Sequence, residues 1–254
     1  MDAVLAVERL GKSFGGVHAL RGVTFHVRAG ELVALIGPNG AGKTTCFNCI
    51  NGQLRPDTGR VSLAGIDITG RSPRDIALAG VGRTFQVAAT FASMTVRQNV
   101  DVALLSHAGR VQALQMSPAR DDRSLADALL ERAGVAALAD RHVATLPYGD
   151  VKRVELALSL AGNPKLLLMD EPTAGMAPAD RGALMATAAE LARRDHVAVL
   201  FTEHDMDVVF GHADRIIVLD RGLAIAEGSP EEIKADARVQ AVYLGDPVTP
   251  SAAP

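Results

Sequence analysis

A glycine-rich run near the start of the chain has the residue types and spacing of a phosphate-binding loop. It reads Gly37-Pro38-Asn39-Gly40-Ala41-Gly42-Lys43-Thr44-Thr45, which matches the pattern G-x-x-x-x-G-K-T. Glycines let several backbone N–H groups converge on one anion without side chains in the way. The helix expected after the loop adds oriented donors and a partial positive charge at its N-terminus. The run therefore predicts a nucleoside triphosphate site.

The polar side chains of this loop suit separate tasks. Lys43 is expected to reach the β- and γ-phosphates, the Thr44 hydroxyl to bind Mg²⁺, and Thr45 to donate to the α-phosphate. The alternative is a glycine-rich turn without a ligand, and it is weaker because such a turn does not require Lys-Thr after its last glycine. The pattern alone does not choose between an ATPase, a GTPase and a kinase.

Two acidic residues form a second candidate site. Asp170 and Glu171 directly follow the apolar run 166–169. In a parallel α/β sheet, ligands lie beyond the carboxyl ends of the strands. Asp170 is then placed to hold Mg²⁺, and Glu171 to polarise a water aimed at the γ-phosphate. An ordinary strand end before a polar turn is the alternative, which the upstream loop makes the weaker one.

The elements that must position these residues follow from the apolar patterns. Three continuously apolar runs, 32–36, 166–169 and 197–201, predict strands covered on both faces. Helical and extended signals alternate along the chain, which predicts an α/β fold with a mostly parallel sheet. Alternation over 23–28 and hairpin patterns at 59–69 and 216–226 predict an additional antiparallel part.

The middle of the chain has mainly helical signals. Thr95 and Gln98 fit a capping box, and apolar residues at helical spacing recur from Leu125 until Gly134. The polar stretch 106–123 is expected to be a mobile connection. These signals predict a single domain, 1–245, in which a helical subdomain, 87–161, is inserted into a core made of 1–86 and 162–245; the tail, 246–254, is expected to be disordered.

The composition excludes several classes of protein. Lys plus Arg number 26 against 29 Asp plus Glu, a net charge of −3 that gives no reason to expect a nucleic-acid partner. The apolar residues, 48% of the chain, suffice for an aliphatic core, and no run is long enough to predict a membrane helix or a signal peptide. Cys46 and Cys49 lack a second ligand pair for zinc, which favours packing.

Five further segments complete an ordered set of motifs: 12–16, 84–86, 146–150, 174–178 and 202–205. With this set the chain resembles the ATP-binding subunits of ABC transporters over nearly its whole length. The stretches 83–86, 146–149, 202–206 and 242–245 resemble ATPases of branched-chain or other hydrophobic amino-acid uptake. ATPases of lipopolysaccharide export look similar, and a non-transport ABC ATPase is a further alternative. No Asn-Lys-x-Asp run for guanine is present.

The resemblance implies an ABC ATPase fold and the cofactors ATP and Mg²⁺. It implies that two ATPase subunits sandwich each ATP between the phosphate loop of one and the signature segment of the other. Phe14 would stack on adenine, and Gln86 would sense Mg²⁺ and the γ-phosphate. His204 would contact the γ-phosphate, and Tyr148 with Gly149 would face the partner's ATP. Thr44, Gln86 and Asp170 would be the Mg²⁺ ligands, and Glu171, His204, Lys43 and Gln86 the catalytic group.

The resemblance also implies partners. These are integral-membrane permease subunits, a second ATPase subunit in a homodimer or heterodimer, and indirectly a substrate-binding protein. The protein would then lie peripherally on the cytoplasmic face of the cell membrane. Val87, Phe91, Met94 and Val96 would line the groove that receives a short helix of the membrane subunit, or they simply pack the helical subdomain.

The signature segment departs from the family pattern. The usual Leu-Ser-Gly-Gly-Gln is here Leu-Pro-Tyr-Gly-Asp, over 146–150. Pro147 offers neither the hydroxyl nor the N–H of serine, and Asp150 adds a negative charge. What remains is the Gly149 N–H and the N-terminus of a helix expected from Val151. We expect weaker capture of the partner's ATP, either in an asymmetric heterodimer or in a homodimer that tolerates the loss.

Overall fold

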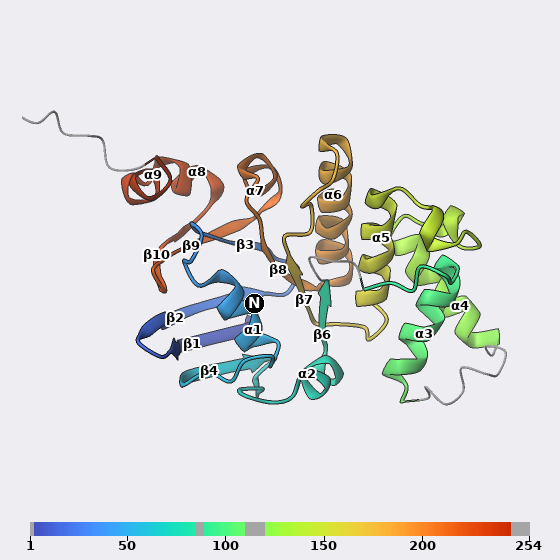
Figure 1. The fold of residues 1–254 in the computed structure, drawn as a ribbon, viewed down its shortest axis with the longest axis horizontal. Coiled ribbons are helices and arrows are strands. Elements are labelled where there is room, and N and C mark those ends of the chain that lie inside the picture. The colour runs from blue at the N-terminus through green and yellow to red at the C-terminus, as the bar shows by residue number, and fades with distance from the viewer. Residues whose placement is uncertain (1–2, 85–88, 110–119, 245–254) are drawn as a thin grey trace, which may run out of the picture.

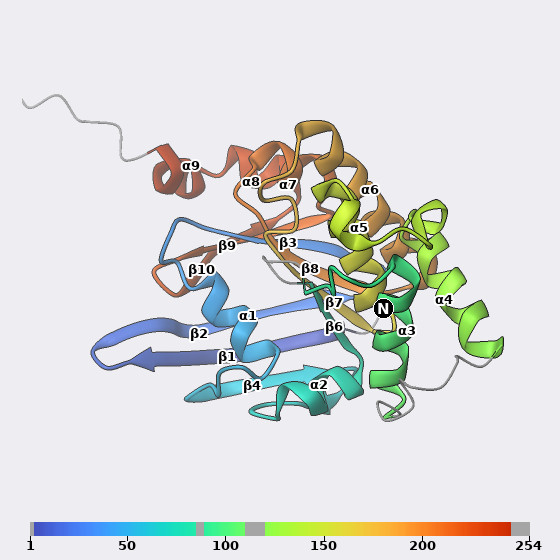
Figure 2. The same cartoon turned by 45° about the vertical axis from the view of Figure 1, so that its right-hand side comes forward.

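The computed structural model describes residues 3–84, 89–109 and 120–244, so predictions for Gln86, Val87 and the tail 246–254 lie outside the described residues. In both views the strands gather at one end of the molecule and a group of helices, coloured green to yellow, at the other (Figure 1 and Figure 2). Within the described ranges no helix is both long and apolar enough to cross a membrane.

The larger sheet has six strands in the order β10-β9-β3-β8-β7-β6. The strands are β3 (Leu32–Ile36), β6 (Val81–Thr84), β7 (Leu166–Asp170), β8 (Ala198–Thr202), β9 (Arg215–Asp220) and β10 (Leu223–Gly228). All neighbours run parallel except β10, which pairs antiparallel with β9. Nearly every residue of β3, β7 and β8 is buried, because helices or the other sheet cover both faces. The predicted α/β fold with a mostly parallel sheet is confirmed.

The smaller sheet is antiparallel, with strands in the order β2-β1-β4-β5. They are β1 (Ala3–Phe14), β2 (Val17–Arg28), β4 (Thr58–Leu63) and β5 (Ile66–Asp67). Aliphatic side chains of both sheets and of helix α1 (Lys43–Ile50) form one core cluster. Cys46 and Cys49 are buried in this cluster with free thiols, as the packing interpretation predicts. Burial raises the pKa of the Cys49 thiol to about 11.

A second core cluster extends from the other face of the large sheet into the helical group. That group contains α3 (Val96–His107), α4 (Arg120–Arg132), α5 (Tyr148–Ser159) and the short 3-10 helices η2 (Ala136–Leu138) and η3 (Val143–Thr145). Helix α5 packs against β6, and α6 (Pro178–Asp195) packs against α5 and β8. The predicted capping box of Thr95 and Gln98 begins α3. The remaining helices are α2 (Pro73–Ala79), α7 (Met206–His212), α8 (Pro230–Ala235) and α9 (Ala237–Leu244).

Two helices begin earlier than the sequence predicts. Helix α4 begins at Arg120, so the expectation of a connection over all of 106–123 is wrong. The buried face of α4 contains Ala126, Leu129 and Leu130, whereas Leu125 is 53% exposed. The polar residues before this face form the first turn of an amphipathic helix.

Helix α5 begins at Tyr148 rather than at Val151. Pro147 occupies the N-cap with φ −57° and ψ 151°, an extended conformation that the proline ring itself favours. The residues of the signature segment that follow Pro147 therefore lie in the first turn of a helix.

Candidate nucleotide site

The glycine-rich loop joins β3 to α1, and two of its glycines are required by close packing. A Cβ on Gly42 would lie 2.5 Å from the Ala19 carbonyl oxygen, and Gly42 has φ +107°. A Cβ on Gly37 would lie 2.2 Å from the Leu219 carbonyl oxygen. At Gly40 a Cβ would meet no atom within 4 Å. The loop is therefore fixed from behind by backbone contacts and open on its other side.

A pocket of about 300 Å³ lies in front of this loop. It brings together most of the nucleotide-binding residues predicted from the sequence, namely Phe14, Asn39, Gly40, Ala41, Gly42, Lys43, Thr44 and Thr45 together with Glu171 and His204. Phe14, at the end of β1, is 47% exposed and offers a flat apolar face at the pocket. Pro38 lies outside this pocket and lines a neighbouring one.

Lys43 is the first residue of α1 and is only 8% exposed. Its Nζ donates hydrogen bonds to the carbonyl oxygens of Gly37, at 2.6 Å, and Pro38, at 3.2 Å. Burial lowers the pKa of the Lys43 amine, and the negative charges of Glu171 and Asp170 oppose that effect. The ammonium group is thus held among oxygen atoms beside two carboxylates.

Asp170 is the last residue of β7, and the strands on both sides orient its carboxylate. Thr202 Oγ1, at the end of β8, donates to Asp170 Oδ1 at 2.9 Å. Arg83, on β6, donates from Nη2 to Asp170 Oδ2 at 3.2 Å. Each carboxylate oxygen therefore accepts a hydrogen bond. These bonds fix the orientation of the carboxylate, as is typical of a ligand for a hard cation.

Glu171 follows with φ +47°, a conformation that non-glycine residues seldom adopt. Its N–H donates to the carbonyl oxygen and to Oγ1 of Thr202, both at 3.1 Å, which holds the backbone in this turn. The Glu171 Oε1 lies 2.8 Å from His204 Nε2. Backbone strain of this kind is concentrated at functional sites because surrounding contacts must maintain it.

The signature segment lies outside the pocket described above, at the N-terminus of α5. A Cβ on Gly149 would lie 3.0 Å from the Asp180 carboxyl carbon, so α6 packs directly on this residue. Tyr148 is 43% exposed, and Lys152 Nζ lies 5.7 Å from the centre of its ring. Asp150 is paired with Arg153, whose Nη1 lies 3.5 Å from Asp150 Oδ1.

Two family models match the chain. The model of the ABC transporter matches residues 20–174, and the model of the branched-chain amino acid ATP-binding cassette transporter matches residues 225–249. The chain belongs to the ABC transporter ATP-binding family. It is therefore an ATPase whose hydrolysis of ATP is coupled to transport, and membership implies permease partners and a dimeric ATPase.

Individual relatives agree with this assignment. The branched-chain amino acid transport ATP-binding protein LivG of Salmonella typhimurium is 40% identical over 251 residues, covering 96% of this chain and 98% of the relative. BraF of Pseudomonas aeruginosa, named for the same transport, is 38% identical over 250 residues, with the same coverage. A solved ATP-binding cassette in its ADP conformation is 32% identical, with a TM-score of 0.86 over 97% of this chain and 100% of that one.

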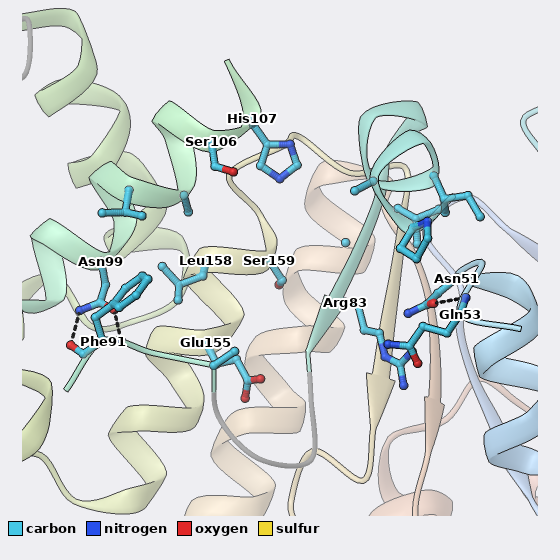
Figure 3. A pocket seen from close by; sticks show the side chains of 18 residues that line it. Asn51, Gln53, Arg83, Phe91, Asn99, Ser106, His107, Glu155, Leu158 and Ser159 are labelled. Atoms are coloured by element: carbon cyan, nitrogen blue, oxygen red, sulfur yellow. Dashed lines mark hydrogen bonds between the residues drawn. The ribbon is translucent and has the colours of Figure 1, made fainter. Parts of the chain in front are cut away.

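The ABC ATPase also has a groove of about 440 Å³ between β6 and the helices α3 and α5. Figure 3 shows Phe91 and Glu155 on one side of it, and Arg83 with Gln53 on the other. Phe91 is 53% exposed, and buried Asn99 holds its backbone through two hydrogen bonds of 2.7 and 3.1 Å. Val96 is fully buried in the helical core, so of its two suggested roles only packing applies.

Sequence reasoning missed two residues of the site. Arg83 and Thr202 bind the two oxygens of Asp170, although the sequence presents each of them only as part of a family motif. No local pattern marks them, because they lie on different strands and reach Asp170 only when the sheet places β6 and β8 on either side of β7. The one usable signal is position: both precede the loops at the carboxyl ends of strands, where ligands of parallel sheets lie.

Proposed function

We propose that this ATPase energises the uptake of branched-chain amino acids. The observation that carries the proposal is the combined match of the C-terminal family model over 225–249 and of relatives named for this transport over 96% of the chain. The substrate itself would be chosen by the membrane subunits and by a substrate-binding protein. This subunit would supply only the free energy of ATP hydrolysis.

The nucleotide would lie in the pocket of the glycine-rich loop, with adenine on Phe14 and the phosphates against Lys43. The donor set suits Mg²⁺, since the Thr44 hydroxyl and the oriented carboxylate of Asp170 are hard oxygen ligands. Gln86 is proposed as a further ligand and sensor from the family motif. Bound Mg²⁺ would neutralise phosphate charge, and Lys43 adds a fixed positive charge beside it.

Glu171 is proposed to accept a proton from the attacking water. Its carboxylate reaches the pocket, and the bond to His204 Nε2 at 2.8 Å fixes the direction in which it points. His204, half exposed at the same pocket, would contact the γ-phosphate once ATP is bound. A positioned general base contributes roughly 10²- to 10⁴-fold to such a step.

Assembly completes the site in this proposal. Tyr148 and Gly149 are not at the pocket of their own chain, so they are proposed to face ATP held by a second ATPase subunit, identical or homologous. The groove at Phe91 would receive a segment of the permease, and the protein would then lie peripherally on the cytoplasmic face of the cell membrane. The inserted helices, 87–161, would then form the subdomain through which this contact is transmitted.

Reconstitution tests the proposal. The protein is co-purified with its membrane subunits, placed in proteoliposomes and assayed for ATP-dependent uptake of labelled leucine. Glu171→Gln should still bind ATP but hydrolyse it at least about 10²-fold more slowly, and uptake should fall in proportion. Glu190→Gln, on the exposed side of α6, is the matched control and should behave as wild type. Export of a lipid without leucine uptake would overturn the proposal.

A further inference from the structure

One side chain belongs to both the nucleotide site and the groove. Arg83 lines the groove, and its guanidinium also contacts the carboxylate of Asp170 at 3.2 Å. Its Nη1 donates to Asn48 Oδ1 on α1, at 3.2 Å, and to Gln53 Oε1 just after α1, at 3.3 Å. Figure 3 shows Arg83 extending from β6 toward Gln53 at the wall of the groove.

The chemistry of the guanidinium suits a rigid connection. Its planar fork can bind several acceptors at fixed angles, which the flexible ammonium of lysine cannot do. The side chain is only 10% exposed, and burial lowers its pKa while Asp170 opposes this, so the charge is held by its partners rather than by water. Moving any one partner must therefore change the contacts of the others.

The contacts of Asp170 give the connection a direction. Thr202 holds Oδ1 from the side of β8, and Arg83 contacts Oδ2 from the side of β6, where the groove lies. A segment that enters the groove and contacts Arg83 or Gln53 would thus act on one of two groups that orient the carboxylate. Coupling between two sites is reciprocal, so cation binding at Asp170 would also alter the affinity of the groove for its occupant.

We propose that Arg83 is a positioning residue that couples occupation of the groove by the permease to the orientation of Asp170. The coupling rests on the proposed function, because that function supplies the permease as the occupant. The orienting part of the proposal does not need the permease and is measurable on the purified ATPase. An ion pair with a purely structural role would stabilise the fold without affecting Mg²⁺ binding or the stimulation of hydrolysis by the membrane subunits.

The first experiment measures Mg²⁺ binding rather than activity. Calorimetric titration gives the affinity for ATP in EDTA and at increasing Mg²⁺. We expect Arg83→Gln to keep its affinity for ATP in EDTA within twofold of the wild type. It should need at least threefold more Mg²⁺ to reach half of the Mg²⁺-dependent gain in affinity for ATP. Arg132→Gln is the control, since it removes a comparably shielded ion pair of 2.8 Å with Asp195 outside both sites. An unchanged Mg²⁺ requirement in Arg83→Gln would overturn the orienting role.

The second experiment measures coupling in the complex with membrane subunits. Arg83→Gln should co-purify with them, yet stimulation of hydrolysis by these subunits should fall at least fivefold, whereas Arg132→Gln should keep full stimulation. Arg83→Lys keeps the charge without the planar fork, so an intermediate loss of stimulation is expected. If Arg83→Gln does not fold, Arg83→Lys takes its place as the test. Full stimulation in Arg83→Lys or Arg83→Gln would overturn the coupling. Failure of the wild type to bind membrane subunits would instead refute the proposed function.

Discussion

The glycine-rich loop and the signature end of α5 differ in how closely their sequences determine their structures. The loop follows its pattern residue by residue, and packing against neighbouring backbone leaves no room for a side chain at Gly37 or Gly42. The signature segment departs from the family pattern, and a neighbouring side chain offsets one of the departures, the added negative charge. Asp150 is paired with Arg153. A segment can therefore depart from the residue types of its motif while a neighbouring side chain pairs the charge that the departure adds.

The difference has a physical origin. A phosphate cradle is built from backbone groups, so its sequence is limited to residues that permit one backbone path. A helix N-terminus binds anions through N–H groups that every helix has, and side chains around it can vary. At α5 the surrounding side chains include a buried ion pair, Lys152 with Glu155 at 3.1 Å, and Glu155 also lines the groove.

The largest effect that tests this comparison is expected in the loop. Gly42→Ala places a methyl group 2.5 Å from the Ala19 carbonyl oxygen at φ +107°. We expect the affinity for ATP, measured by calorimetry, to fall at least about tenfold, or about 1.4 kcal/mol. Gly182→Ala, where a Cβ meets no atom within 4 Å, is the control. Wild-type affinity in Gly42→Ala would mean that the loop is not fixed by packing.

A smaller gain is expected at the signature. Pro147→Ser restores a hydroxyl and an N–H, so ATP-dependent dimerisation should tighten roughly fivefold, or about 1 kcal/mol, the worth of a typical hydrogen bond. Sedimentation with ATP measures the dimerisation constant. Pro147→Ala restores the N–H alone and should recover only part of this gain. An unchanged constant in Pro147→Ser would refute the expectation that this segment captures ATP weakly.

The smallest effect is expected at Asp150. Because Arg153 lies 3.5 Å away and both side chains are about a quarter exposed, much of the carboxylate charge is already offset. Asp150→Gln should therefore change the dimerisation constant less than about twofold, in keeping with the small worth of exposed pairs. Arg153→Gln leaves the charge of Asp150 unpaired and should weaken dimerisation by more than Asp150→Gln changes it. If Asp150→Gln exceeds the gain of Pro147→Ser, charge rather than the lost donors limits this segment.

Local sequence was sufficient wherever one segment decides its own structure. The three apolar runs form buried strands, and Thr95 with Gln98 caps α3, because strand burial and capping depend on residues adjacent in the chain. The beginning of α4 was missed because polar residues at a helix start resemble a connection until the packed face beyond them is known. Burial of Val96 likewise depends on what α3 packs against.

By itself, the sequence determined that this chain has a phosphate-binding loop followed by a helix, and a strand that ends in Asp170 and Glu171. These features depend on backbone freedom and apolar patterning, which are local properties. Only the tertiary structure decided that Arg83 and Thr202 share the carboxylate of Asp170, and that Arg83 also faces the groove. The reason is that a parallel sheet places distant strands side by side, so partners separated by many residues meet at one edge.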